Sequence, residues 1–264
     1  MAKIRLDQHL TKTAGLESRE KARAIIMSGV VFIDGKRMDK PGQMIDEGAE
    51  LEVRGATMPY VSRGGLKLEK ALSAFAVNPS GCVCIDCGAS TGGFTDCLLQ
   101  NGASEVYAVD VGYGQLDWKI RNDSRVHVFE RTNIRRLTPA DIGAKPSLAV
   151  MDLSFISLKI VLPAVFELLE ETGEVICLIK PQFEAGREHV GKKGVVRDPL
   201  VHEMVIEQFV QNANAANFAI AGLDFSPIKG PEGNIEYLAH LQKNKAQTEV
   251  FAVKELVEKS HAQS

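Results

Sequence analysis

Residues 83–96, VCIDCGASTGGFTD, constrain the fold of this chain more than any other stretch. An apolar run reaches Asp86, a glycine-rich turn follows over Gly88–Gly93, and a helix is expected to begin at Phe94. A buried strand, a tight glycine turn and a helix N-terminus together let backbone N–H groups approach a ligand closely. The segment therefore predicts a ligand site after the first strand of an α/β sheet.

The second predicted strand, EVYAVD, supports this interpretation because it ends on Asp110. An acidic residue about 20 positions after the first glycine is where a doubly wound fold binds ribose hydroxyls. The dinucleotide fingerprint requires glycine at the third place of the turn, where this chain has Ser90, so a nicotinamide oxidoreductase is disfavoured. The pattern Asp-x-Gly-x-x-x-Gly instead resembles motif I of the S-adenosylmethionine-dependent methyltransferases.

Composition limits the classes of protein that fit. The 264 residues, 45% of them hydrophobic, suffice for one large or two modest domains with a substantial core. The formal net charge of −3 means that any surface for nucleic acid must be local. The sequence has no apolar run long enough to span a membrane and no signal peptide at its N-terminus. A cytoplasmic protein without a membrane partner is expected.

The cysteines are odd in number and lie mostly in strand-like runs, with no histidine nearby. Alternation along a strand directs Cys82 and Cys84 to one face and Cys87 to the other, which argues against a metal cluster. We expect no metal and no disulfide framework, and interpret them as small buried side chains in a reducing compartment. They are Cys82, Cys84, Cys87, Cys97 and Cys177.

Residues 1–54 form a predicted unit of their own. A short helix is expected around Leu6, and a second helix is capped by Ser18 and ends at Gly29. Short strands follow, with a turn at Asp34-Gly35. The segments RLDQHL and SREKARAIIMSGVVFIDGKRMDKPG are similar to the S-four domain, a small RNA-binding module.

That resemblance implies contact with structured RNA, mainly through phosphate and shape. Arg19 and Arg23 lie at i and i+4 and share one helix face. The alternative for such a charge run is a solvated helix face. The expected RNA-binding residues are Arg5, Arg19, Arg23, Lys36, Arg37 and, beyond a linker at 55–61, Arg63.

From residue 62 to 264 the chain alternates strands and helices, which predicts an α/β domain with a mostly parallel sheet. A final pair of strands, Ala219–Asp224 and Ile235–Leu241, is expected to close the sheet as antiparallel edge strands, before a helix at 250–259. The other expected strands lie near 82–87, 105–110, 126–129, 147–152 and 174–180. The expected helices lie near 66–76, 94–100, 115–121, 159–169 and 198–213.

Ligands of open α/β sheets bind outside the carboxyl ends of the strands, so the residues standing there are informative. Strand four ends in Asp152, and strand five, ICLIK, ends in Lys180. A lysine ending an apolar strand is unusual because a buried ammonium is costly unless it is paired. Lys180 could simply form a salt bridge that fixes a loop, but Asp152 and Glu236 are both expected near it.

Over nearly the whole chain the motifs SRGGLK, DCGASTGGFTD, AVDVGYGQL, ERTNIR, MDLSF, LIKPQFE and GNIEYL resemble the TlyA family. These are ribosomal RNA ribose 2′-O-methyltransferases, also named haemolysins, with an N-terminal S-four domain and an FtsJ-type catalytic domain. The resemblance implies a Rossmann-like S-adenosylmethionine-dependent methyltransferase sheet with a small α+β S-four-type domain. The catalytic tetrad of FtsJ-type enzymes falls on Lys67, Asp152, Lys180 and Glu236, with Lys70 as a competitor for the first place.

The resemblance also implies roles for these residues. Lys180 would deprotonate or polarise the 2′-hydroxyl, and Asp152 and Glu236 would orient the lysines. The substrate would be ribosomal RNA, free or within ribosomal subunits. The residues expected to bind S-adenosylmethionine are Asp86, Gly88, Ser90, Thr91, Gly92, Gly93, Phe94, Asp110, Val111, Asn133 and Asp152.

Some alternatives stay open at this point. A noncatalytic RNA-binding factor would keep the same fold, although the intact tetrad argues against it. A membrane-active haemolysin is disfavoured because the sequence has neither a transmembrane span nor a long basic amphipathic helix. The loop at 184–198 carries basic residues among glycines; it is either a mobile flap over RNA or a solvated surface loop.

Overall fold

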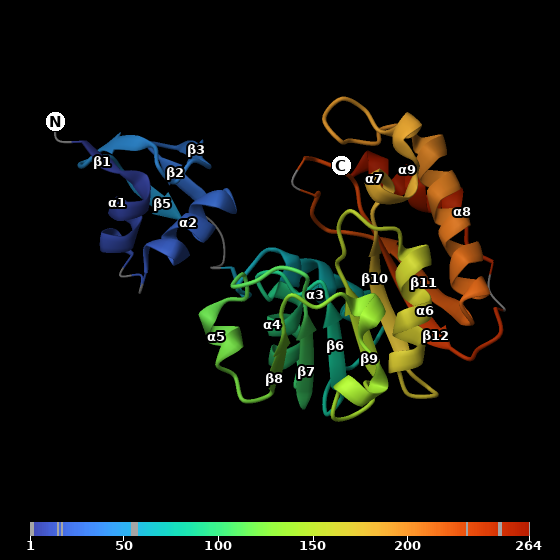
Figure 1. Cartoon of the computed structure of the whole chain (residues 1–264). Helices are drawn as coiled ribbons and strands as arrows, with labels where there is room; N and C mark the ends of the chain where they lie inside the picture. Colours follow the sequence, from blue (N-terminus) through green and yellow to red (C-terminus); the bar gives the residue numbers. More distant parts are fainter. Residues whose placement is uncertain are drawn as a thin grey trace. The chain divides into compact units, whose positions relative to one another are not determined.

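The computed structural model separates the chain into two compact units, residues 1–63 and 64–264 (Figure 1). Part of the expected linker at 55–61 lies outside the described residues. Residue 54, where the first unit was expected to end, also lies outside them. The structure describes residues 3–14, 16, 18–53, 58–230, 232–247 and 250–263.

Two helices and short strands make up the first unit. Helices α1 (Leu6–Thr13) and α2 (Arg19–Met27) contribute to a core that contains Leu6, Leu10, Ala22, Ile26, Val31, Ile33 and Ile45. Strand β1 (Lys3–Arg5) pairs with β4 (Met44–Asp46), and β2 (Val31–Ile33) lies between β3 (Lys36–Met38) and β5 (Leu51–Val53). The β1–β4 pair was not predicted, because three-residue strands carry too little alternation to be recognised.

The local signals in this unit are confirmed. Ser18 Oγ accepts a hydrogen bond from the backbone N–H of Lys21, which caps α2. Gly29, just after α2, has φ +77°, the left-handed conformation that ends many helices. Asp34 and Gly35 both have positive φ, as a tight turn between two antiparallel strands requires.

A central sheet organises the second unit, with seven strands among the described residues in the order β11-β12-β10-β9-β6-β7-β8. The five strands from β10 to β8 are parallel, as predicted. They are β6 (Val83–Cys87), β7 (Glu105–Val109), β8 (Val126–Phe129), β9 (Leu148–Met151) and β10 (Glu174–Ile179).

The antiparallel pair consists of β11 (Phe218–Phe225) and β12 (Tyr237–Lys243). Of these two strands, β11 lies at the edge of the sheet and β12 does not, because β12 inserts between β10 and β11 and pairs with both. The expected start of the last strand at Ile235 is wrong by two residues. The Gly230 N–H donates to the Asn234 carbonyl and closes a turn first, so Glu236 stands immediately before the strand.

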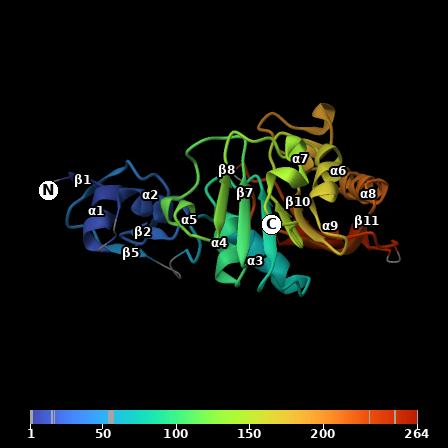
Figure 2. The same cartoon turned by 60° about the horizontal axis from the view of Figure 1, so that its bottom comes forward.

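Helices cover both faces of this sheet (Figure 2). Helices α3 (Gly64–Ala74) and α4 (Gly93–Gln100) lie on one face, and α6 (Leu158–Leu168), α8 (Pro199–Ala215) and α9 (Val253–Ala262) lie on the other. Shorter pieces are α5 (Trp118–Arg121), α7 (Pro181–Glu184) and the 3₁₀ helices Ile134–Arg136, Pro139–Asp141 and Arg187–His189.

Helix α5 begins at Trp118 rather than at the expected residue 115, because Asp117 caps it by accepting from the Lys119 N–H. Within the part of the chain that the structure describes, every helix is too short or too polar to cross a membrane.

Candidate active site

Three of the predicted site residues lie on the same face of the sheet. Met151 and Ile179 belong to the core under α6 and α8. Successive residues of a strand point to opposite faces, so Asp152 and Lys180, one position later, point to the α3 face. Glu236 reaches the same face at the start of β12 and meets α3 there. Three separate strand ends therefore deliver charged side chains to one place.

The four predicted tetrad residues form one continuous cluster. Lys67 Nζ, from α3, lies 2.6 Å from Glu236 Oε2 and 3.5 Å from Asp152 Oδ2. Lys180 Nζ lies 2.6 Å from Asp152 Oδ1 and 3.1 Å from Ser154 Oγ. Positive and negative groups thus alternate from Glu236 through Lys67 and Asp152 to Lys180. The Asp152 side chain is 20% exposed, and the other three are at most 8% exposed.

The two lysines differ in how their hydrogen-bond donors are used. Lys67 lies between two carboxylates, while Lys180 faces one carboxylate and the hydroxyl of Ser154. Burial acts to raise the pKa of Asp152, but the charges of Lys67 and Lys180 outweigh it and hold the pKa below its ordinary value.

Lys70 does not join this cluster. Its Nζ lies 3.0 Å from Asp224 Oδ2 and 4.0 Å from the centre of the Phe225 ring. One helical turn separates it from Lys67, and the geometry places Lys67, not Lys70, against the carboxylates.

Two aromatic side chains beside Lys180 were missed by the sequence analysis. Phe155 is 90% exposed, and its ring centre lies 5.0 Å from that of Phe183. Phe155 also has φ +63°, a conformation that non-glycine residues rarely adopt and that often marks a functional site. The available signal was its position three residues after Asp152, in the motif MDLSF.

The glycine turn after β6 has the conformation that its sequence demands. Gly88 and Gly92 have φ of +91° and +95°. A Cβ on Gly88 would lie 3.0 Å from Leu153 Cδ2 and 3.2 Å from the Asp152 carbonyl oxygen, so only glycine fits. The Asp110 carboxylate accepts from the N–H groups of Ser90, at 2.8 Å, and Gly112, at 2.6 Å. The turn is therefore tied to the end of β7.

Asp86 lies deeper, at the end of β6. Its side chain is fully buried; Oδ2 accepts from Thr95 Oγ1 at 2.7 Å, whereas Oδ1 has no hydrogen-bond partner among the described residues. Burial, opposed by the hydrogen bond from Thr95, raises the pKa of Asp86 to about 7. A buried polar atom without a partner beside a glycine turn is a feature that a bound ligand would explain.

The remaining residues expected at the cofactor differ in exposure. Thr91 and Val111 are exposed, and Gly93 is buried at the start of α4. Phe94 is 3% exposed and belongs to the buried core. Asn133 Oδ1 already accepts from the Arg135 N–H and caps a 3₁₀ helix.

Comparisons with known proteins identify the family of this chain. A family model described as FtsJ-like methyltransferase matches residues 60–243. The chain belongs to the FtsJ-like methyltransferase family. A second model, the S4 domain, matches residues 4–51, so an S4 domain precedes the FtsJ-like domain.

The relatives share both parts of the chain. YqxC of Bacillus subtilis, named as a candidate rRNA methyltransferase, is 54% identical over 90% of this chain and 85% of its own length. TlyA of Mycobacterium tuberculosis, named 16S/23S rRNA (cytidine-2′-O)-methyltransferase, is 44% identical over 91% of this chain and 90% of its own. A solved structure of a protein named as a candidate hemolysin from Streptococcus thermophilus has a TM-score of 0.80 at 49% identity, covering 100% of this chain and 97% of its own.

In the S4 domain, the three predicted RNA-binding arginines of the helical region gather around one carboxylate. Asp7 is fully buried. Arg5 Nη2, Arg19 Nη2 and Arg23 Nε lie 2.9, 3.0 and 3.6 Å from Asp7 Oδ2. The hydrogen bond from Arg5 holds the pKa of Asp7 far below its ordinary value. The arginine side chains remain 38–54% exposed, so each can also face a ligand. Asp7 was not predicted as their common partner.

The other residues expected to contact RNA are exposed. Lys36 and Arg37 lie on β3, and the Arg37 guanidinium occupies the space where a Cβ of Gly29 would stand. Arg63 is exposed one residue before α3, the helix that carries Lys67.

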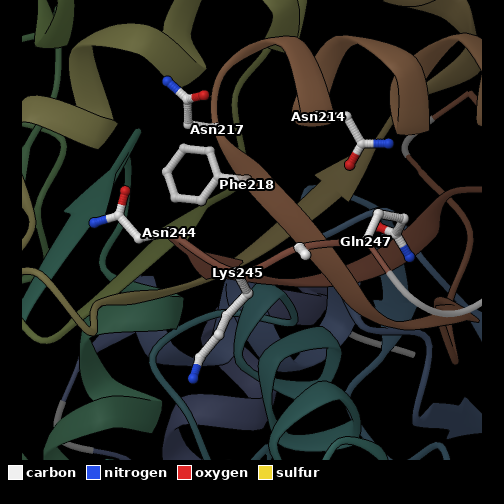
Figure 3. A pocket seen from close by; sticks show the side chains of 7 residues that line it. Asn214, Asn217, Phe218, Asn244, Lys245 and Gln247 are labelled. Atoms are coloured by element: carbon white, nitrogen blue, oxygen red, sulfur yellow. The ribbon is translucent and has the colours of Figure 1, made fainter.

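A hollow of about 520 Å³ lies in the FtsJ-like domain, at the end of strands β11 and β12 that is opposite to the tetrad (Figure 3). Phe218 begins β11 and pairs with Lys243 at the end of β12, whereas Glu236 precedes the start of β12. The hollow is thus separated from the tetrad by the length of the strand. Figure 3 shows the Lys245 side chain extending away from the Phe218 ring. The hollow is lined by Asn214, Asn217, Phe218, Asn244, Lys245, Ala246 and Gln247.

Proposed function

We propose that this chain transfers a methyl group from S-adenosylmethionine to a ribose 2′-hydroxyl of ribosomal RNA. The observation that carries the proposal is the buried alternation of Glu236, Lys67, Asp152 and Lys180 at the carboxyl edge of the sheet. The site adjoins the glycine turn, since Gly88 closely approaches the Asp152 backbone. Membership of the FtsJ-like family and the names of the TlyA relatives support the same reaction.

The residues around the glycine turn fit S-adenosylmethionine. Asp110 is held by two backbone N–H groups and keeps free lone pairs for ribose hydroxyls. Gly88 leaves room for close approach beside Asp152, and Asp86 Oδ1 offers an unused polar atom. The cofactor would supply a methyl group that its sulfonium already activates. The chain must therefore align the hydroxyl and remove its proton, and alignment alone can contribute about 7–11 kcal/mol.

Lys180 is the residue proposed to act on the hydroxyl. Its Nζ would take up the 2′-hydroxyl proton, while bound S-adenosylmethionine would supply the methyl group and depart as the neutral thioether. Asp152 Oδ1, 2.6 Å away, stabilises the ammonium that results, and the proton then leaves to solvent. Ser154 fixes the direction of the side chain through its hydrogen bond. General-base assistance of this kind typically contributes about 10²–10⁴-fold in rate.

Lys67 and Glu236 have a supporting part in this proposal. Lys67 bridges Glu236 and Asp152, which fixes the Asp152 carboxylate and keeps its pKa low. Asp152 therefore remains ionised and available to Lys180. The S4 domain would bind the RNA through phosphate contacts by its arginines, the mode expected for structured RNA. A ribosomal RNA substrate also accords with the cytoplasmic location expected from the sequence.

The test is transfer of labelled methyl from S-adenosylmethionine to unmodified ribosomal subunits, with mapping of 2′-O-methylated nucleotides. Wild type should label RNA, and Lys180→Ala should lose at least about 100-fold in rate while still binding the cofactor. Lys70→Ala is the matched control, because Lys70 lies on α3 outside the cluster, and it should retain activity. Wild type that binds the cofactor but labels no RNA, or Lys180→Ala with full activity, would overturn the proposal.

A further inference from the structure

The segment between α7 and α8 carries a concentration of positive charge next to the candidate site. We call residues 186–197 the basic loop. It contains Arg187, Lys192, Lys193 and Arg197 against one acid, Glu188. All four basic residues are exposed, and no ion pair joins any of them to another residue that the structure describes. This loop lies within residues 184–198, the segment for which the sequence left a mobile flap and a solvated surface as alternatives.

Asn234 fastens the far end of this loop. Its Oδ1 accepts from the Val196 N–H at 3.1 Å, and its Nδ2 donates to the Gly194 carbonyl at 2.9 Å. Asn234 is 4% exposed, so water competes poorly for these bonds. One amide side chain thus makes a two-point contact with the loop backbone.

His202, on α8, fastens the same part of the loop from the other side. Its Nε2 lies 3.0 Å from the Val196 carbonyl, which can only accept, so Nε2 carries the hydrogen. Its Nδ1 lies 2.7 Å from the Tyr237 hydroxyl and accepts from it. Both backbone groups of Val196 are therefore bonded to buried side chains. No histidine was expected to have a role from the sequence, because this network joins residues far apart in the chain.

Both fastening points connect to the segment that carries Glu236. Asn234 lies two residues before Glu236, and Tyr237, the partner of His202, follows it directly. Glu236 itself lies 2.6 Å from Lys67. The basic loop and the tetrad carboxylate are thus attached to one short stretch of backbone at the start of β12.

We propose that the basic loop is a fixed docking surface for the phosphate backbone of RNA, and that Asn234 and His202 are positioning residues that hold it beside Glu236. This inference rests on the proposed function, because it names how RNA is held at that site. Lysine and arginine side chains bind phosphates without preference for the base sequence, and the neighbouring glycines let the loop approach the RNA backbone closely. A loop fixed at Val196 presents these charges without the entropy loss of ordering a mobile flap.

The charge test is the double substitution Lys192→Gln/Lys193→Gln. We expect weaker binding of ribosomal RNA and a KM for RNA raised by about tenfold. The slope of log affinity against log salt concentration should become shallower by about 0.7–0.9 for each phosphate that the variant no longer neutralises. The matched control is Lys145→Gln/Lys245→Gln, which makes the same charge change near the opposite edge of the sheet and should bind RNA like wild type.

The positioning test is Asn234→Ala, alone and combined with the lysine pair. If Asn234 acts through the loop, the lysine substitutions cost less in the Asn234→Ala background than in wild type, whereas a merely structural role gives independent effects. Trypsin should also cleave after Lys192 or Lys193 faster in Asn234→Ala and in His202→Ala than in wild type. Cofactor affinity should be unchanged in all of these variants.

The outcomes separate this inference from the proposed function. A wild type that fails to methylate RNA overturns the proposed function. A wild type that methylates while the Lys192→Gln/Lys193→Gln variant keeps its RNA affinity and salt dependence overturns the docking surface. Additive effects with unchanged trypsin cleavage overturn the positioning roles of Asn234 and His202.

Discussion

Lys67 Nζ lies 2.6 Å from Glu236 Oε2, and this ion pair joins residues that are 169 positions apart in the chain. The pair connects α3, which comes before the first strand of the sheet in the chain, to the start of β12, which is the last strand of the sheet in the chain. Both side chains are nearly inaccessible to water, at 7% and 1% exposure. A buried ion pair is costly to break from one side, because the remaining charge is left without a partner.

Lys67→Met should therefore destabilise the FtsJ-like domain by about 3–5 kcal/mol, measured by chemical denaturation of the full chain. The double variant Lys67→Met/Glu236→Gln should recover much of that loss, because no unpaired buried charge remains. Methyl transfer should stay low in both variants. A double variant no more stable than Lys67→Met would contradict the explanation.

The Glu236 carboxylate occupies the space that a side chain at position 230 would need. A Cβ added at Gly230 would stand 2.7 Å from Glu236 Oε1, which is closer than real contacts allow. Gly230→Ala should displace the carboxylate from Lys67 and lower the rate of methyl transfer by about tenfold or more, with RNA affinity retained. Gly48→Ala, where an added Cβ meets nothing within 4 Å, is the control. Full activity of Gly230→Ala would show that the position of Glu236 is not critical.

We predict that Phe155 stacks on an unpaired base of the RNA. It is 90% exposed, in a strained conformation, and packs against Phe183. Base stacking on an aromatic side chain contributes about 1–3 kcal/mol, so Phe155→Ala should lower kcat/KM for RNA by about 5–150-fold. Phe155→Tyr should stay near wild type, because the stacking face is kept. Equal losses in the two variants would point to a role other than stacking.

The residues that end the parallel strands could be predicted from the sequence. Asp152 and Lys180 follow apolar runs, and the carboxyl ends of parallel strands meet at one edge, so their proximity follows from the pattern. Lys67 could not be placed in this way. It lies on a helix outside the sheet, and only the family resemblance distinguished it from Lys70, which the structure places against Asp224.

The sequence could not predict contacts between segments that have no hydrophobic periodicity. Nothing in the spacing of Val196, His202 and Asn234 indicates that they meet, because each lies on a different loop or helix. The partner of the S4-domain arginines was missed for a related reason. A buried Asp7 among exposed arginines has the sequence pattern of an ordinary charged helix start, and only the fold reveals its burial.

Asp86 predicts a specific dependence of stability on pH. Its pKa is about 7 in the folded chain against an ordinary value of 3.8, mainly because of burial. Between these two values the folded chain holds a proton that the unfolded chain has released. The contribution of Asp86 to stability therefore falls as pH rises through this window and is constant above about pH 7. At 1.36 kcal/mol for each pKa unit, the total change is on the order of 4 kcal/mol.

Asp86→Asn isolates this contribution, because asparagine has the same shape, still accepts from Thr95, and carries no charge at any pH. Other groups titrate in the same range, including His202, whose pKa is lowered by burial. Their effects cancel when the free energy of unfolding of wild type is subtracted from that of the variant at each pH. The difference should grow in favour of Asp86→Asn from about pH 4.5 to about pH 7.5 and then level off. A difference that is the same at both ends of this range would mean that Asp86 is ionised in the folded chain.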